Sequence, residues 1–151
     1  MTAALRRAQA SDGPVMGAIL QGWIEDTPWM PVLHSLADTQ AFCAHLVEAE
    51  ECWVAEADEQ VQGFLARKNG WITALYLRPD ARGRGLGTGL LTRAQEGAAE
   101  LQPRCFQENL AAQRFYEAAG FRAEERTDGA GNAERLPDIR YVWRQERREM
   151  S

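Results

Sequence analysis

Four glycines at alternate positions between residues 83 and 89 constrain this chain more than any other feature. They follow the strand-like run Trp71–Leu77, and an apolar helical stripe begins among them at Leu86. A strand, a glycine-rich turn and a helix start present free backbone N–H groups at the positive end of a helix dipole. Arg82 and Arg84 add charged, fork-shaped donors for the same anion. The segment therefore predicts a pyrophosphate site at the end of a strand.

Three other interpretations of this loop fit the residues less well. A Walker A loop needs Gly-Lys-Ser/Thr, and the run contains no lysine. A dinucleotide-binding G-x-G-x-x-G fingerprint counted from Gly83 meets Thr88 in place of its third glycine, although Glu108 follows where a ribose-binding acid could stand. A glycine-rich turn without any ligand would lower helix propensity without an evident benefit.

Composition and charge limit the classes of protein to which this chain can belong. A chain of 151 residues with 5 Trp, 5 Phe and 3 Tyr has enough apolar area for one domain. We expect that domain over residues 1–151, with the charged segment 144–151 as a frayed tail. A formal net charge of −5 argues against a nucleic-acid partner. The apolar runs are too short for a membrane span, and no apolar run follows the first arginines as a secretory signal would require.

Cysteine and histidine usage predicts a reduced protein without a metal. Three cysteines, Cys43, Cys52 and Cys105, lack CxxC spacing and indicate free thiols in the cytoplasm. The two histidines, His34 and His45, have no paired ligands at metal-binding spacing, so we expect no metal site.

The hydrophobic periodicity predicts a mixed α/β domain. We expect strands at 5–8, 52–56, 61–67, 71–77, 104–107, 121–125 and 139–143. The loop at 57–60 and the Asn69-Gly70 turn predict antiparallel hairpins. The strand–helix–strand unit at 71–107 implies one parallel crossover of right-handed sense.

Four helices are expected between these strands. The first runs from residue 11 to the break at 27–31, and the second begins at Ser35 and carries the apolar pair Phe42 and Leu46. The third begins near residue 85, with an apolar stripe that reaches Leu101, and Pro103 ends it. The fourth covers 109–119 and is closed by Gly120.

Two segments of this chain have motif-like spacing, and they are Arg82-Gly-Arg-Gly-Leu-Gly87 and Asn109-Leu-Ala-Ala-Gln-Arg-Phe-Tyr-Glu-Ala-Ala-Gly-Phe121. The first resembles the Q/R-x-x-G-x-G/A loop of the GNAT superfamily of acetyl-CoA-dependent N-acetyltransferases. The second is similar to the same family's N-x-x-A-x-x-F-Y-E-x-x-G-F helix, at the expected distance. The element order also agrees, so the resemblance covers residues 4–143.

The resemblance implies a GNAT fold, which is a mixed, mostly antiparallel sheet with a splayed central parallel strand pair and about four helices. It further implies direct transfer of an acetyl group from acetyl-CoA to a primary amine of a small molecule or peptide, in a ternary complex. The alternative is a catalytically inactive acyl-CoA-binding module of the same fold. Homodimers are common in the superfamily, so a homodimer is a further expectation.

The resemblance also assigns roles to residues. The pantetheine arm would lie between the strands at 71–77 and 104–107, against the backbone of Leu75, Tyr76 and Leu77. Asn109 would hydrogen-bond this arm, a role compatible with that of a simple helix N-cap. The pyrophosphate cradle would comprise Arg82, Gly83, Arg84, Gly85, Leu86, Gly87 and Thr88.

Tyr116 is the catalytic candidate that the resemblance supplies. A phenol beside the sulfur could protonate the leaving thiolate, whereas residue type alone favours a core tyrosine. The strand 71–77 contains no acid, so the base that deprotonates the amine is left open among Glu108, Asp26 and His34. Cys105 with a histidine could form an acyl-enzyme, but a buried inert thiol is the simpler interpretation.

The acceptor site is expected from the first two helices, the loop between them and the loop after Arg126. Trp29, His34 and Glu108 are the candidate substrate contacts. Aromatic and acidic side chains in these segments favour a cationic amine; they are Trp23, Trp29, Phe42, Glu25, Asp26, Asp128, Glu134 and Asp138.

Overall fold

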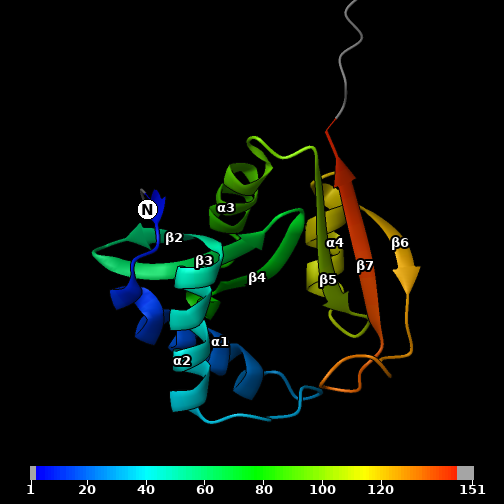
Figure 1. Ribbon diagram of the computed structural model, residues 1–151, viewed down its shortest axis with the longest axis horizontal. Coiled ribbons are helices and arrows are strands. Elements are labelled where there is room, and N and C mark those ends of the chain that lie inside the picture. The colour runs from blue at the N-terminus through cyan, green and yellow to red at the C-terminus, as the bar shows by residue number, and fades with distance from the viewer. Residues whose placement is uncertain (1–2, 146–151) are drawn as a thin grey trace, which may run out of the picture.

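The computed structural model describes residues 3–145, and its strands form one seven-stranded sheet in the order β1-β2-β3-β4-β5-β7-β6 (Figure 1). The strands are β1 (Ala4–Arg7), β2 (Glu51–Ala57), β3 (Gln60–Lys68), β4 (Trp71–Leu77), β5 (Glu100–Phe106), β6 (Arg122–Arg126) and β7 (Asp138–Arg144). The helices are α1 (Gly13–Asp26), α2 (Leu36–Ala49), α3 (Leu86–Gln95) and α4 (Leu110–Ala118), with short 3-10 turns at Ala10–Asp12 and Pro79–Ala81. Among residues 3–145, β4 and β5 form the one parallel pair. This confirms the predicted mixed, mostly antiparallel sheet with four helices.

Tight turns join β2, β3 and β4 into an antiparallel meander. Asp58 and Glu59, between β2 and β3, both adopt positive φ angles of 54° and 62°. Asn69, which precedes Gly70 between β3 and β4, has a φ of 56°. The left-handed pair Asp58 and Glu59 suits the twist of a two-residue hairpin. β2 pairs with β3 and β3 with β4 in antiparallel sense, so both predicted hairpins are confirmed.

The parallel pair separates soon after it begins. β4 and β5 pair only at Trp71 with Gln102 and at Ile72 with Pro103, and Figure 1 shows the two strands diverging from there. Thr73 is an extra residue on β4, because Ala66 of β3 pairs with Ala74 while Arg67 pairs with Ile72. Such a bulge bends the strand that carries it. The sheet therefore opens between β4 and β5, as the family resemblance implied.

Two apolar clusters cover the two faces of β2 and β3. Met16 and Leu20 of α1 pack with Cys43 of α2 against a face that includes Val54 and Phe64. The other face carries Ala55 and Leu65 and packs against α3 through Leu90 and Leu91, and this cluster continues to Tyr116 and Tyr141. Because successive residues of a strand point to opposite faces, both clusters draw on the same strands.

The prediction that the third helix extends to Leu101 and ends at Pro103 is wrong. α3 ends at Gln95, and Gly97 then turns the chain with a φ of 74°. Leu101 and Pro103 are both in β5. The Gln102 N–H donates to the Gly70 carbonyl at 2.8 Å. Because neighbouring backbone groups of a strand point to opposite sides, the nitrogen of Pro103, which carries no hydrogen, faces β7. β5 pairs with β7 at Leu101 and again from Arg104 onward, so the pairing is interrupted at Pro103. A strand tolerates proline at such an interruption.

Two smaller predictions also need correction. Phe42 is 50% exposed, because the buried face of α2 is formed by Thr39, Cys43 and Leu46, so the predicted pair of Phe42 with Leu46 is not buried together. Arg144, predicted to lie in the tail, ends β7 and pairs with Glu124 at 2.7 Å. The Gln145 N–H of that predicted tail donates to the Ala99 carbonyl at 2.8 Å, and residues 146–151 lie outside the described residues.

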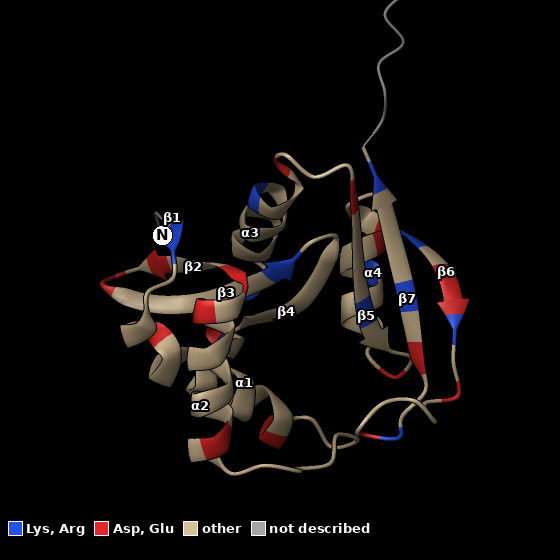
Figure 2. Ribbon diagram, in the orientation of Figure 1, with Lys and Arg blue, Asp and Glu red and all other residues tan. Residues whose placement is uncertain are grey.

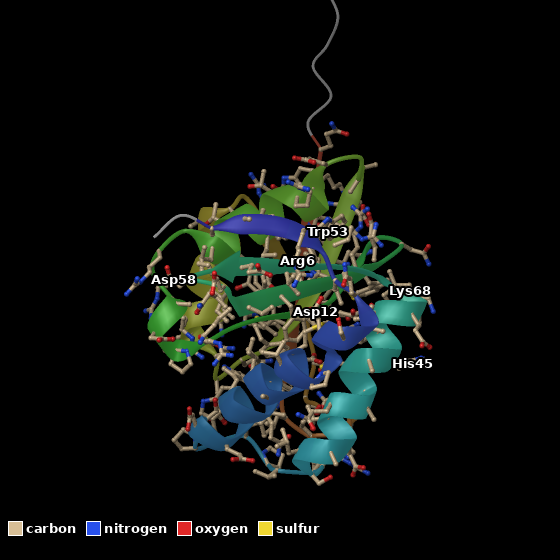
Figure 3. All side chains as sticks on the ribbon, turned by 90° about the vertical axis from the view of Figure 1, so that its left-hand side faces the viewer. Arg6, Asp12, His45, Trp53, Asp58 and Lys68 are labelled. Atoms are coloured by element: carbon tan, nitrogen blue, oxygen red, sulfur yellow. The ribbon has the colours of Figure 1, made fainter. Side chains whose placement is uncertain are left out.

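A salt bridge from Arg6 to Asp12 links β1 to the start of α1 (Figure 3). Its guanidinium donates to both carboxylate oxygens of Asp12, at 2.8 and 3.0 Å, and its Nε donates to Glu56 at 2.9 Å. Asp12 also accepts the Gln9 backbone N–H at 2.7 Å. The Arg6 hydrogen bond holds the pKa of the Asp12 carboxyl below its ordinary value. This contact contributes stability above the unfolded pKa of an aspartate, and that stability is lost as the pH falls through the lowered folded pKa.

Within residues 3–145, none of the helices is both long enough and apolar enough to cross a bilayer.

Two glycines of α1 give opposite predictions for the same substitution. A Cβ on Gly17 would lie 2.5 Å from the Cα of Gln40 on α2, so Gly17→Ala forces the two helix backbones apart. We expect it to lower the free energy of unfolding by about 1–3 kcal/mol. Gly22→Ala, whose Cβ would meet nothing within 4 Å, should raise the same quantity by about 0.5–1 kcal/mol.

Urea unfolding of both variants and of the wild type measures this difference. Equal effects of the two alanines would contradict the close packing of α1 on α2.

Candidate active site

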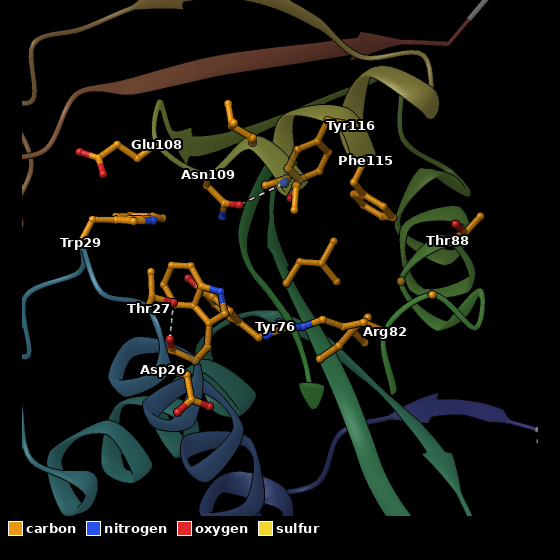
Figure 4. A pocket seen from close by; sticks show the side chains of 18 of the residues that line it. Asp26, Thr27, Trp29, Tyr76, Arg82, Thr88, Glu108, Asn109, Phe115 and Tyr116 are labelled. Carbon is orange, nitrogen blue, oxygen red and sulfur yellow. Dashed lines mark hydrogen bonds between the residues drawn. The ribbon is translucent and has the colours of Figure 1, made fainter. Parts of the chain in front are cut away.

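A pocket of about 590 Å³ lies where the end of β4, the glycine loop, the start of α4 and the end of α1 meet (Figure 4). Its walls are formed by Trp23, Asp26, Thr27, Pro28, Trp29, Leu75, Tyr76, Leu77, Arg82, Gly83, Gly85, Gly87, Thr88, Glu108, Asn109, Leu110, Ala111, Ala112, Phe115 and Tyr116. Most of the predicted site residues are in this set, which draws on four separate segments of the chain.

The glycine loop forms one end of the pocket. Gly83 and Gly85 have φ angles of 75° and 82°, which favour glycine, and Gly85 is the N-cap of α3. The first backbone bond of the helix runs from the Gly89 N–H to the Gly85 carbonyl at 3.0 Å. The N–H groups between these two residues have no acceptor within the helix. A helix start with free N–H groups beside Arg82 fits a phosphate anion.

The gap between β4 and β5 continues from this pocket. A smaller pocket of about 80 Å³ is lined by Ile72–Tyr76 of β4 and by Arg104–Phe106 of β5, together with Trp23, Asn109, Ala112 and Tyr116. Leu75, Tyr76, Asn109 and Tyr116 line both pockets. Among residues 3–145, the edge of β4 that faces β5 has no strand partner beyond Ile72. Its backbone N–H and C=O groups are therefore available to an extended ligand with amide groups.

Tyr116 is held at the junction of the two pockets. Its ring packs against Phe115 and Phe121, both at 5.3 Å between centroids, and against Tyr141 at 6.0 Å, so that only 6% of the residue is exposed. Burial raises the pKa of Tyr116 above its ordinary value near 10. The hydroxyl therefore stays protonated at neutral pH and can act as a proton donor.

Asn109 is the N-cap of α4. Its Oδ1 accepts the Ala112 N–H at 3.1 Å, as Figure 4 shows, and the side-chain amide nitrogen is not used in this cap. The residue thus combines the predicted capping role with a donor at the pocket wall.

The opposite end of the pocket is acidic and aromatic. Figure 4 shows Asp26, Trp29 and Glu108 toward one end, and Arg82 and Thr88 toward the other. Figure 2 shows the corresponding acidic positions at the end of α1 and on the turn between β5 and α4. The pocket therefore has one end with free backbone N–H groups and Arg82 and an opposite end with two carboxylates, although the whole chain has a net charge of −5.

Several predicted residues lie elsewhere. Arg84 is exposed and outside the pocket walls, and Leu86 is buried in the core against β2 and β3. His34 is exposed, and its backbone carbonyl accepts a hydrogen bond from Gln21 at 3.1 Å. Asp138 bonds to Thr127 at 2.5 Å on the far side of β5. The other predicted acceptor-wall residues outside the pocket walls are Glu25, Phe42, Asp128 and Glu134.

Cys105 lines the gap but is a poor nucleophile. Burial raises the pKa of its thiol to about 12, so the reactive thiolate is scarce at neutral pH. His34 and His45 are exposed on the surface, outside both pockets. This arrangement gives no support to the Cys–His acyl-enzyme interpretation.

Part of the pocket wall consists of residues that were not predicted as site residues. Leu110, Ala111, Ala112 and Phe115 line the pocket from the first turns of α4. The available signal was their position directly after the Asn109 N-cap, which places the first turns of α4 beside the pocket.

Comparison with known proteins gives a consistent picture. Residues 48–123 match the family model described as the acetyltransferase (GNAT) domain. The chain is 34% identical to the peptidyl-lysine N-acetyltransferase YiaC of Escherichia coli K12 over 125 residues, which cover 78% of this chain and 82% of the relative. It is 27% identical over 146 residues to the peptidyl-lysine N-acetyltransferase YjaB of the same strain, covering 94% of this chain and 99% of the relative.

Two solved structures share the fold. The apo form of YjaB from Escherichia coli superposes with a TM-score of 0.77 at 24% identity, over 94% of this chain and 97% of that one. The structure of yncA from Salmonella typhimurium with its cofactor acetyl-CoA superposes with a TM-score of 0.74 at 18% identity, over 100% of this chain and 98% of that one.

Arg82 and Arg84 offer a matched test of the anion-binding end. A hydrogen bond to a charged group contributes about 1.5–3 kcal/mol, and because Arg82 is exposed we expect the lower end. Arg82→Ala should therefore raise the Kd of coenzyme A about tenfold. Arg84→Ala, which removes the same charge outside the pocket wall, should change the Kd much less.

Isothermal titration with coenzyme A gives both Kd values. A larger effect at Arg84 than at Arg82 would show that the phosphates lie elsewhere.

Proposed function

This chain belongs to the GNAT family of acetyltransferases, and from that membership we propose that it moves an acetyl group from acetyl-CoA to the side-chain amine of a lysine in a peptide or protein. The two-ended pocket carries this proposal, because it joins an anion-binding glycine loop to an acidic, aromatic wall across the β4–β5 gap. The names of the relatives YiaC and YjaB, both peptidyl-lysine N-acetyltransferases, support the acceptor class.

The residues present fit acetyl-CoA as the acetyl donor. The backbone N–H groups of residues 86–88 and the Arg82 guanidinium would hold the pyrophosphate. The free edge of β4 at Leu75–Leu77 and the amide nitrogen of Asn109 would bind the pantetheine arm. When bound, the donor supplies an acetyl thioester, whose carbonyl carbon the amine attacks and whose sulfur departs as a thiolate. The neighbour yncA, which has this fold, was solved with acetyl-CoA.

Tyr116 Oη would supply a proton to the departing sulfur. Its burial keeps the phenol protonated, and the surrounding rings fix its direction. A donor that is already oriented costs no reorganisation during the reaction.

Asp26 and Glu108 would attract the acceptor as an ammonium ion and then accept its proton, directly or through water. An amine must be neutral to attack, and these are the carboxylates of the pocket wall.

Because Cys105 stays a thiol, transfer would be direct, with both substrates bound together. Free buried cysteines also suit a reduced, cytoplasmic setting.

Tyr116→Phe is the main test of this proposal. Removal of a general acid should lower kcat by about a hundredfold or more. The Kd of acetyl-CoA should stay near the wild-type value, because the ring and its packing remain. Thiol release from acetyl-CoA with a lysine-containing peptide as acceptor measures kcat.

Tyr141→Phe is the matched control. Its hydroxyl donates to Glu117 at 2.6 Å, outside both pockets, so its loss should leave kcat nearly unchanged. Equal kcat values for the wild type and Tyr116→Phe would remove Tyr116 from the mechanism. Tight acetyl-CoA binding without turnover on any amine would favour the inactive binding module.

Thermal unfolding with acetyl-CoA or with NAD separates the two coenzyme classes. At a hundredfold excess over its Kd, acetyl-CoA should add about 2.7 kcal/mol to the free energy of unfolding and raise Tm by a few degrees. NAD should leave Tm unchanged. Stabilisation by NAD alone would reinstate the dinucleotide-binding interpretation.

A further inference from the structure

A continuous row of aromatic rings crosses the opening between β4 and β5. It begins at Phe64 on β3 and continues to Tyr76 on β4, with 5.9 Å between centroids. Tyr76 contacts Trp23 of α1 at 5.2 Å, and Trp23 contacts Trp29 in the α1–α2 loop at 6.0 Å. Trp29 in turn contacts Phe106 at the end of β5 at 5.7 Å. These spacings are those of contacting rings, so the row bridges two strands that no longer pair.

Trp29 is the residue that completes this bridge, and the loop that carries it is fixed at both ends. At its start, the Thr27 hydroxyl donates to the Trp23 carbonyl at 2.5 Å, and the Met30 N–H donates to the Thr27 carbonyl at 3.0 Å. At its end, the buried amide of Gln21 donates to the His34 carbonyl at 3.1 Å. Trp29 therefore stands in a preformed wall.

The chemistry around Trp29 restricts what can reach Tyr116. Trp23, Trp29 and Tyr76 line the pocket, and the carboxylates of Asp26 and Glu108 belong to the same end. The carboxylates favour a cation, and the ring faces favour methylene groups behind it. A lysine side chain has this form, with a charged tip on an unbranched apolar stem. The α-amine of a peptide carries a branched carbon and a polar carbonyl within two bonds, and the ring faces cannot hydrogen-bond that carbonyl.

We propose that Trp29 determines acceptor specificity, admitting the slender side chain of an internal lysine and excluding the amino terminus of a peptide. This inference rests on the proposed function and adds to it the residue that makes the selection.

The test compares two acceptor peptides of the same core sequence. One has a blocked amino terminus and a single lysine, and the other has a free amino terminus and no lysine. The quantity measured is the ratio of their kcat/KM values in the acetyl-CoA thiol-release assay. Wild-type protein should favour the lysine peptide. Trp29→Ala should lower this ratio by about tenfold or more, through a higher KM for the lysine peptide and a lower KM for the peptide with a free amino terminus. The Kd of acetyl-CoA should not change.

Phe42→Ala is the matched control, since it removes an exposed ring outside both pockets and should leave the ratio unchanged. Trp29→Phe keeps an aromatic face in a smaller side chain, so it should fold and give an intermediate ratio. An unchanged ratio in folded Trp29→Ala, or in Trp29→Phe if the alanine variant does not fold, would overturn the inference. Absence of transfer to either peptide by the wild type would instead overturn the proposed function, and the inference with it.

Discussion

The loss of pairing between β4 and β5 is the constraint on which the rest of the site depends. After Ile72 and Pro103 the two strands diverge, and the backbone groups on their facing edges lose their ladder partners. Buried backbone groups without partners are costly, so a folded chain must leave such an edge open to water, cover it or offer it to a ligand. This molecule uses α4 and the aromatic row to cover part of the opening and leaves Leu75 and Tyr76 on the wall of a pocket. The same break in the sheet therefore requires α4 and the aromatic row as cover and also forms the pocket itself.

Local electrostatics at this opening outweigh the overall charge of the chain. The net charge of −5 would repel an anionic ligand at long range, but screening reduces that effect beyond about 10 Å at ordinary ionic strength. Within the pocket, the helix start and Arg82 lie at one end, and Asp26 and Glu108 lie at the opposite end. Two reactants of opposite charge would thus be directed to opposite ends of one cavity, which reduces the chance that either blocks the other's position.

The sequence was informative where function depends on short segments and less so where it depends on distant contacts. The glycine loop and the Asn109 cap are local, since backbone φ angles and an i+3 hydrogen bond specify them, and both were predictable. The end of α3 was missed because Ala98 and Leu101 continue the helical spacing by coincidence, while Gly97 breaks the helix. The contact of Trp29 with Phe106 had no local signal at all, because only the tertiary fold brings the α1–α2 loop to the end of β5.

The acceptor end is built as a rigid wall, and this bears on how it can select. The segment between β5 and α4, which carries Glu108 and Asn109, is held from two sides. The Gln113 amide donates to the Gln107 carbonyl at 2.7 Å, and the Gln107 amide donates to the carbonyls of Thr127 and Asp138 at 3.0 and 3.1 Å. With Trp29 packed on Phe106, neither wall has to be ordered when substrate arrives. Preorganised walls spare the binding energy that a closing loop would consume, so under the proposed function discrimination between amines would rest on fixed shape and charge.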